Sequence, residues 1–181
     1  MTQAREPRVL RVEEACRGRR FSLGRVEALI RGRRVVLDAL LHPGAVAVLA
    51  VDKGRVLLER QFRPVVGRWL YEIPAGTLEP GEEPEEAAAR ELREETGYVA
   101  GRLRRLLEFY PSPGVSTEKI VVFLAEELRL GERSLEPDEV IETVWLPLRE
   151  ALEMIRRAEI IDGKTIVALL YYAMLAGETG E

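Results

Sequence analysis

The sequence is poor in cysteine, histidine and side-chain amides. Cys16 is its only cysteine, which excludes an intrachain disulfide and fits a reducing compartment such as the cytoplasm. His42 is the only histidine, and because it precedes a proline where a strand is expected to begin, we assign it a structural role. Asparagine is absent and glutamine occurs only as Gln3 and Gln61, a bias that either a thermophilic source or a GC-rich genome would produce.

Long apolar runs and a strong charge of one sign are also missing. No run approaches the ~18 apolar residues that a membrane helix needs, and no N-terminal run is typical of a secretion signal, so we expect a cytoplasmic protein without a membrane partner. The 27 basic and 31 acidic residues leave a net charge of −4, which argues against a nucleic acid held by bulk charge. The 181 residues suffice to bury a core without disulfides or structural metals.

The most informative stretch is residues 75–98, a loop rich in glycine and proline followed by a predicted helix. Pro84 suits the first helical position, and Gly97 suits the left-handed residue that ends many helices. On this helix Glu91, Glu94 and Glu95 share an arc of roughly 100°. Like charges this close destabilise a helix, so the cluster indicates either a solvated acidic face or a bound cation.

The spacing of the whole stretch favours the cation. Gly76 is followed after five residues by Glu82, and after seven more by Arg90-Glu91-Leu92-Arg93-Glu94-Glu95-Thr96-Gly97-Tyr98. This pattern resembles the Nudix box, G-x5-E-x7-R-E-U-x-E-E-x-G-U with U a bulky apolar residue, and departs from it only mildly, in the aromatic Tyr98. The resemblance implies an enzyme that hydrolyses a diphosphate linked to another moiety, with Mg²⁺ or Mn²⁺ as cofactor.

The resemblance also implies roles for single residues. The metal ligands would be Glu91, Glu95, the backbone carbonyl of Ala75 and, directly or through water, Glu94. Such oxygen ligands suit Mg²⁺, which keeps several of its waters. Arg90 would pair with a box glutamate and orient it, and Glu82 would be structural.

The order of predicted elements gives the fold class. Residues 1–41 are basic and strand-like, with a hairpin expected at Arg31-Gly32, and residues 42–181 alternate strands with helices. We expect an α/β protein, an α/β/α sandwich around a mixed sheet, in which an almost wholly apolar strand at 45–51 is buried on both faces. By resemblance this is the Nudix fold, and residues 1–41 form either a β-rich dimerisation arm or an ordinary extra hairpin.

A second set of motifs resembles the ADP-ribose pyrophosphatase branch of the family. These motifs are Arg60-Gln61-Phe62-Arg63-Pro64, Tyr71-Glu72-Ile73-Pro74-Ala75-Gly76 and Ser112-Pro113-Gly114, with Pro113 sixteen residues past Gly97. The implied reaction is hydrolysis of ADP-ribose to AMP and ribose 5-phosphate. The candidate substrate-binding residues are Arg63, Glu72, Pro113 and Gly114. Arg63 could instead form a structural salt bridge, and Glu72 could pair with an arginine.

Other interpretations remain open. The substrate could be another nucleoside-diphosphate sugar or a dinucleoside polyphosphate, or the chain could be a non-catalytic nucleotide-sensing module, although such modules commonly lose box glutamates that are present here. Residues 128–138 are expected to form a polar loop. The general base is expected either at Glu139, in an acidic loop before the last strand, or at Glu94. Neighbouring acids of that loop could be confused with Glu139, namely Glu136, Asp138 and Glu142. We expect a homodimer, because a small hairpin arm cannot bury its own apolar residues.

Overall fold

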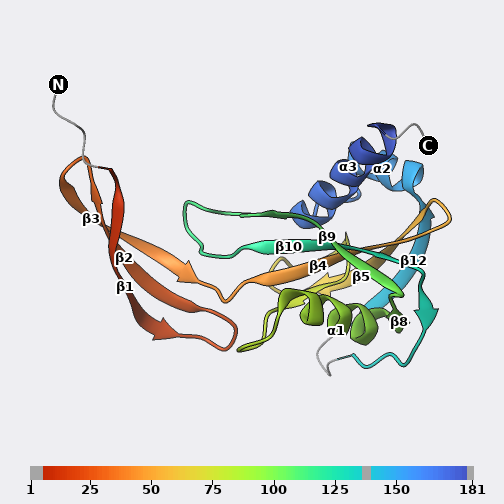
Figure 1. The fold of residues 1–181 in the computed structure, drawn as a ribbon, viewed down its shortest axis with the longest axis horizontal. Coiled ribbons are helices and arrows are strands. Elements are labelled where there is room, and N and C mark those ends of the chain that lie inside the picture. Colours follow the sequence, from red (N-terminus) through yellow and green to blue (C-terminus); the bar gives the residue numbers. More distant parts are fainter. Residues whose placement is uncertain (1–5, 136–139, 179–181) are drawn as a thin grey trace. The chain divides into compact units, whose positions relative to one another are not determined.

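The structure, a computed structural model, describes residues 6–135 and 140–178 and divides into two compact units. The first unit comprises Met1–Gly44 and Tyr110–Lys119, and the second comprises Ala45–Phe109 and Ile120–Glu181. Figure 1 traces the elements of both units along the chain. No helix in the described part of the chain is long and apolar enough to cross a membrane.

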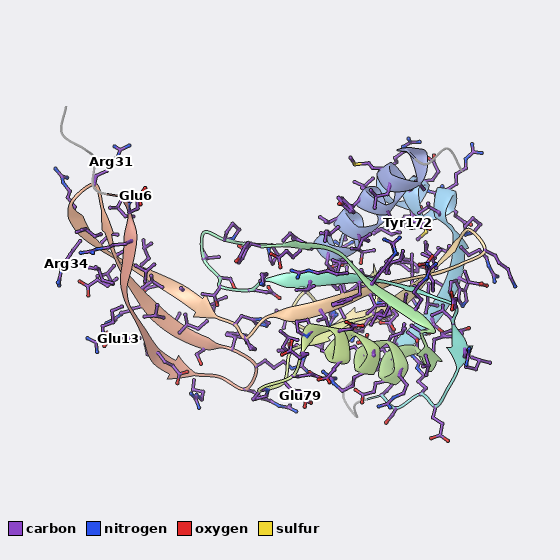
Figure 2. All side chains as sticks on the ribbon, in the orientation of Figure 1. Glu6, Glu13, Arg31, Arg34, Glu79 and Tyr172 are labelled. Carbon is purple, nitrogen blue, oxygen red and sulfur yellow. The ribbon has the colours of Figure 1, made fainter. Side chains whose placement is uncertain are left out.

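The first unit is built on an antiparallel three-stranded sheet in the order β1-β2-β3, whose strands are β1 (Arg8–Arg17), β2 (Ser22–Ile30) and β3 (Arg33–Leu41). The expected hairpin joins β2 to β3, with positive φ at both Arg31 (51°) and Gly32 (77°), as a two-residue turn of this kind requires. Arg31 is labelled at its tip in Figure 2. Along β1 every side chain is exposed, so this sheet has no core of its own on that strand.

The loop Tyr110–Lys119 belongs to the first unit because it binds the end of β3. The Leu40 amide donates to the Val115 carbonyl (2.8 Å), and the Thr117 amide donates to the Leu40 carbonyl (2.9 Å). His42 has the structural role predicted for it, since its Nδ1 accepts the amide of Gly44 at 3.1 Å.

The second unit contains a mixed seven-stranded sheet in the order β12-β5-β4-β10-β9, in which β6 adds to β5 and β7 adds to β4. Only the β4–β10 pairing among these is parallel. Its strands are β4 (Ala45–Asp52), β5 (Arg55–Arg63), β6 (Arg68–Glu72), β7 (Ala75–Thr77), β9 (Arg102–Phe109), β10 (Ile120–Glu126) and β12 (Ile141–Pro147).

Two apolar clusters fill the two sides of this sheet. Alternate residues of β4 face opposite sides, as they must in a strand, so one strand feeds both clusters. One cluster packs against α1 (Pro84–Thr96) and the other against α2 (Leu148–Arg156) and α3 (Gly163–Glu178). Figure 1 shows α1 on one side of the sheet and α2 and α3 on the other. The α/β/α sandwich predicted from the sequence is confirmed, and so is the doubly buried strand.

One short sheet escaped the sequence analysis. Residues 128–138 were expected to form a polar loop, but β11 (Arg129–Leu130) pairs with β8 (Tyr98–Val99) just after α1. The loop prediction was wrong at these two residues. Both strands are only two residues long, too short to produce a recognisable alternation of apolar and polar side chains.

Candidate active site

The carboxylate-bearing helix begins and ends where the sequence predicted. Proline occupies the first turn of α1, and Gly97 at its end adopts φ 76° with its amide bonded to the Arg93 carbonyl (2.8 Å). Three apolar residues of α1 are fully buried against the sheet, namely Ala87, Ala88 and Leu92. This packing fixes the rotation of the helix, and therefore which side its glutamates occupy.

The strand β7 approaches the glutamate side of α1 closely enough to require glycine. A Cβ built on Gly76 would lie 1.8 Å from Glu91 Oε1, so any other residue at this position would collide with the carboxylate. One residue earlier, the Ala75 amide donates to Glu95 Oε2 at 2.9 Å, and Glu95 is only 3% exposed. The backbone at Ala75 and the carboxylates of Glu91 and Glu95, three predicted metal ligands, are therefore brought together.

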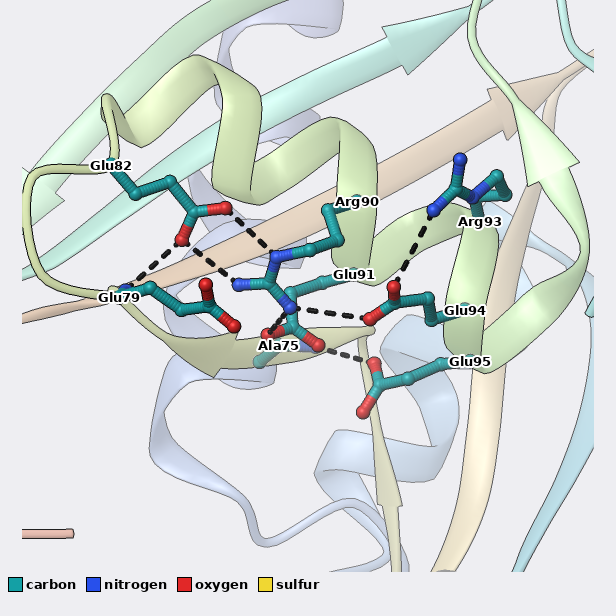
Figure 3. A network of polar contacts seen from close by, with 8 residues as sticks. All are labelled: Ala75, Glu79, Glu82, Arg90, Glu91, Arg93, Glu94 and Glu95. Carbon is teal, nitrogen blue, oxygen red and sulfur yellow. Dashed lines mark hydrogen bonds and ion pairs between the residues drawn. The ribbon is translucent and has the colours of Figure 1, made fainter. Parts of the chain in front are cut away.

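Arg90 holds the remaining box glutamates in place. Its Nε and Nη2 donate to the two oxygens of Glu82 (2.8 and 3.0 Å), while its Nη1 donates to Glu91 Oε1 (2.7 Å) and Glu94 Oε2 (3.2 Å). Figure 3 shows these carboxylates around the guanidinium. The Arg90 hydrogen bonds lower the pKa of Glu82, and they raise the pKa of Arg90 itself. Arg90 is thus placed to orient the carboxylates of Glu82, Glu91 and Glu94.

The donor set fits a hard divalent cation. Its groups are the carboxylates of Glu91, Glu94 and Glu95 and the carbonyl of Ala75, and all of them present oxygen. Within residues 6–135 and 140–178, no three acidic, histidine or cysteine side chains converge into a ready-made metal cluster. A hard divalent cation such as Mg²⁺ needs only one or two protein carboxylates, because waters and substrate phosphates complete its coordination.

Two of the predicted substrate-binding residues bind each other. Arg63 Nε and Nη2 donate to the two oxygens of Glu72 at 2.8 and 2.7 Å, and Glu72 also accepts a hydrogen bond from Lys164. Burial alone would raise the pKa of Glu72, but the hydrogen bonds and charges of Arg63 and Lys164 outweigh it and lower this pKa to about 2. The salt bridge considered as the alternative for Arg63 is therefore formed in this structure.

The other candidates lie elsewhere. Pro113 and Gly114 lie in the loop of the first unit, where the amides of Val115 and Ser116 turn back to the Ser112 carbonyl. Glu139 lies outside the described residues, together with Glu136 and Asp138. Glu142 is on β12 and accepts a hydrogen bond from Arg60 at 3.2 Å.

Beside these candidates lies a group of buried polar residues that was not predicted from the sequence. Glu59 on β5 is 1% exposed, and burial raises its pKa to about 8 although the charge of Arg133 opposes this. Among the described residues, Glu59 Oε1 and Gln61 Oε1 are buried without a hydrogen-bond partner. The available signal was the spacing of Glu59 and Gln61, which are two residues apart in the strand and therefore lie on the same face as the buried Leu57.

The chain is similar to known proteins in both sequence and fold. A family model described as "NUDIX domain" matches residues 40–169. An ADP-ribose pyrophosphatase of Bacillus subtilis is 47% identical to this chain over 146 residues, which cover 79% of each chain. A GDP-mannose pyrophosphatase of Escherichia coli is 42% identical over 158 residues, which cover 81% of this chain and 80% of the other. A crystal structure of an "ADP compounds hydrolase" superposes with a TM-score of 0.84 over 99% of both chains at 23% identity, which supports the fold alone. The geometry of the box, the family match and these identities together establish that this chain belongs to the Nudix family.

Proposed function

We propose that the protein is a pyrophosphohydrolase that hydrolyses ADP-ribose to AMP and ribose 5-phosphate with Mg²⁺ or Mn²⁺. The observation that most supports a catalytic site is the complete, assembled box, in which Arg90 bonds to Glu82, Glu91 and Glu94 while Glu95 bonds to the Ala75 amide. Every box glutamate is present, which argues against a non-catalytic sensing module. The choice of ADP-ribose is supported by the similarity to the Bacillus subtilis enzyme.

In this proposal Glu91, Glu95 and the Ala75 carbonyl hold the metal, and Glu94 holds it directly or through a water. The bound metal would neutralise charge on the diphosphate and lower the pKa of a water. Arg90 holds the carboxylates of Glu91 and Glu94 in place through its hydrogen bonds. Gly76 leaves the space that the Glu91 carboxylate occupies, and therefore allows the strand and the helix to approach.

Arg63 and Glu72 are proposed to bind substrate as a preorganised pair. The Arg63 side chain is 33% exposed while Glu72 is 2% exposed, so the pair presents the guanidinium rather than the carboxylate to solvent. A guanidinium fixed by a bidentate bond on one edge can bind a phosphate oxygen with little further loss of side-chain entropy. For Pro113 and Gly114 we propose that the rigid φ of the proline shapes a loop contacting the sugar.

The general base is proposed to be Glu139, with Glu94 as the rival. Glu94 Oε2 is bonded to Arg90 at 3.2 Å and Glu94 Oε1 lies 3.4 Å from Arg93, so both carboxylate oxygens already contact a cationic side chain. That environment suits a metal ligand better than a base, and so supports a base from outside the box.

We propose a homodimer in which residues 1–41 contact the partner subunit and residues 42–181 form the hydrolase domain. Apolar side chains of the sheet β1–β3 and of the turn between β1 and β2 are exposed within the chain, including Val9 (61%), Val12 (52%) and Val36 (63%) in the strands and Phe21 (50%) in the turn. A second subunit would bury this surface. The single cysteine supports a cytoplasmic location, and the net charge of −4 argues against a nucleic acid held by bulk charge.

A substrate panel tests the proposal. ADP-ribose, ADP-glucose, GDP-mannose, NADH and diadenosine polyphosphates are each incubated with enzyme and Mg²⁺ or Mn²⁺, and kcat/KM is ranked. ADP-ribose is expected to rank first. A clear preference for GDP-mannose, the substrate named for the Escherichia coli relative, would overturn the choice of substrate but not the reaction class. No turnover of any compound with either metal would favour the sensing module.

A further inference from the structure

The C-terminal end of α1 is capped by a segment that the sequence analysis treated as part of a polar loop. The last carbonyls of a helix have no partner within the helix. Here the Glu94 carbonyl accepts the Ser134 amide (3.0 Å), the Glu95 carbonyl accepts Arg133 Nε (2.5 Å), and the Gly97 carbonyl accepts the Gly131 amide (2.6 Å). Residues 131–134 therefore bind the very turn that bears two predicted metal ligands.

Arg133 makes a second contact that the backbone amides cannot make. Its Nη2 donates to the Ile141 carbonyl at 2.9 Å, at the first residue of β12. Because β12 pairs along its whole length with β5, the guanidinium links the end of α1 to the central sheet. The positive charge of Arg133 also lowers the pKa of Glu59 on β5, against the effect of burial. A positive charge at a helix C-terminus is also favoured by the helix dipole.

Glu95 is consequently held from two sides. Its carboxylate accepts the Ala75 amide, and its backbone carbonyl accepts Arg133 Nε. The side-chain contact sets where the carboxylate lies relative to the predicted carbonyl ligand of Ala75, and the backbone contact sets where the turn itself lies. Loss of either contact would leave the turn free to shift relative to β7.

We propose that Arg133 is a positioning residue for the metal site, fixing the last turn of α1 so that Glu94 and Glu95 meet the cation in the correct place. The inference rests on the proposed function only in taking these carboxylates as metal ligands. Removing residues that orient metal ligands commonly lowers metal affinity 10- to 100-fold. Arg133 is exposed as a residue, so its replacement is expected to leave the core intact.

The test is direct metal binding without substrate. Mn²⁺ is titrated calorimetrically into the full-length wild type, R133Q, R133K and the control R129Q. Arg129 lies on the neighbouring β11, and its side chain has no hydrogen bond or ion pair to α1 among the described residues. We expect the Kd for Mn²⁺ to rise about tenfold in R133Q. The Kd should rise by a smaller factor in R133K, because lysine has a single donor group for the two carbonyls. The Kd of R129Q should equal that of the wild type.

Activity measurements then separate positioning from simple stabilisation. In R133Q the loss of turnover should be large at limiting metal and should largely disappear at saturating metal. If R133Q folds and binds Mn²⁺ with wild-type affinity, the proposal is overturned, even if the Tm of R133Q is lowered. If R133Q does not fold, wild-type Mn²⁺ affinity in R133K would overturn the proposal. Weakened Mn²⁺ binding in R133Q alongside a wild type inactive on ADP-ribose would support this role for Arg133 while refuting the proposed substrate.

Discussion

Replacing Glu59 by glutamine is expected to make the protein more stable at pH 8 and to change its stability little at pH 5. Glu59 is 1% exposed, and burial raises its pKa to about 8 from its ordinary value of 4.5. Between these two values the folded state retains a proton on this carboxyl that the unfolded state has released. The unfolded state therefore binds fewer protons, and the free energy of unfolding falls as the pH rises through this window.

The magnitude follows from the size of the shift. Each pKa unit corresponds to about 1.4 kcal/mol, so the full shift sets an upper limit of about 5 kcal/mol lost between pH 4.5 and pH 8. Above pH 8 both states are ionised and the contribution is constant. Protonation also gives Glu59 a donor, and Gln61 Oε1 on the same face of β5 is a buried acceptor without a partner among the described residues. A glutamine at position 59 would supply a donor at every pH.

The assay is urea unfolding of the wild type and E59Q at pH 5, 6, 7 and 8. The difference in unfolding free energy between E59Q and the wild type should grow toward pH 8, by at least ~1 kcal/mol overall and by up to about 1.4 kcal/mol per pH unit. E142Q is the control, because Glu142 has a 65% exposed side chain and lies next to Thr143, the cross-strand partner of Glu59. Parallel stability curves for E59Q and the wild type would refute the reasoning.

Three further predictions concern catalysis and assembly. E91Q and E95Q should each lose at least ~10²-fold in kcat while remaining folded by circular dichroism, the loss expected when stabilisation of transition-state charge is removed; wild-type turnover with wild-type metal titration would exclude them as ligands. E139Q should lose ~10²–10⁴-fold in kcat with KM little changed, and E136Q should keep its kcat. A near-normal kcat in E139Q together with a large loss of kcat in E94Q would place the base in the box. Light scattering at micromolar concentration should give the mass of a dimer, and a monomer would contradict the role proposed for residues 1–41.

The predictable parts of the fold are those determined by neighbours in sequence. Pro84 and Gly97 bracket α1 because each suits one special backbone position, and the structure places the helix between them. The apolar run at 45–51 predicted a strand buried on both faces, and β4 is such a strand. In the box, the spacing predicted which carboxylates share a side of the helix, since that depends only on the helical repeat.

Contacts between distant residues could not be predicted in this way. Arg133 and Glu95 are 38 residues apart, and Lys164 and Glu72 are 92 apart, so no local pattern relates either pair. Glu59 was passed over because a charged residue in a strand is ordinarily assigned to the solvent side, and only the structure shows it to be buried, on the same face of β5 as Leu57. These long-range polar contacts hold residues of the candidate site in place, and the box motif alone does not predict them.

The most direct test of a metal-dependent ADP-ribose hydrolase centred on α1 is chromatographic measurement of AMP formed from ADP-ribose. Wild type with Mg²⁺, wild type with EDTA, and E95Q with Mg²⁺ are compared at matched concentrations. We predict AMP and ribose 5-phosphate in equal amounts from the wild type with Mg²⁺, none with EDTA, and a rate at least ~10²-fold lower from E95Q. Undiminished AMP formation by E95Q, or no AMP from the wild type with Mg²⁺, would contradict the account.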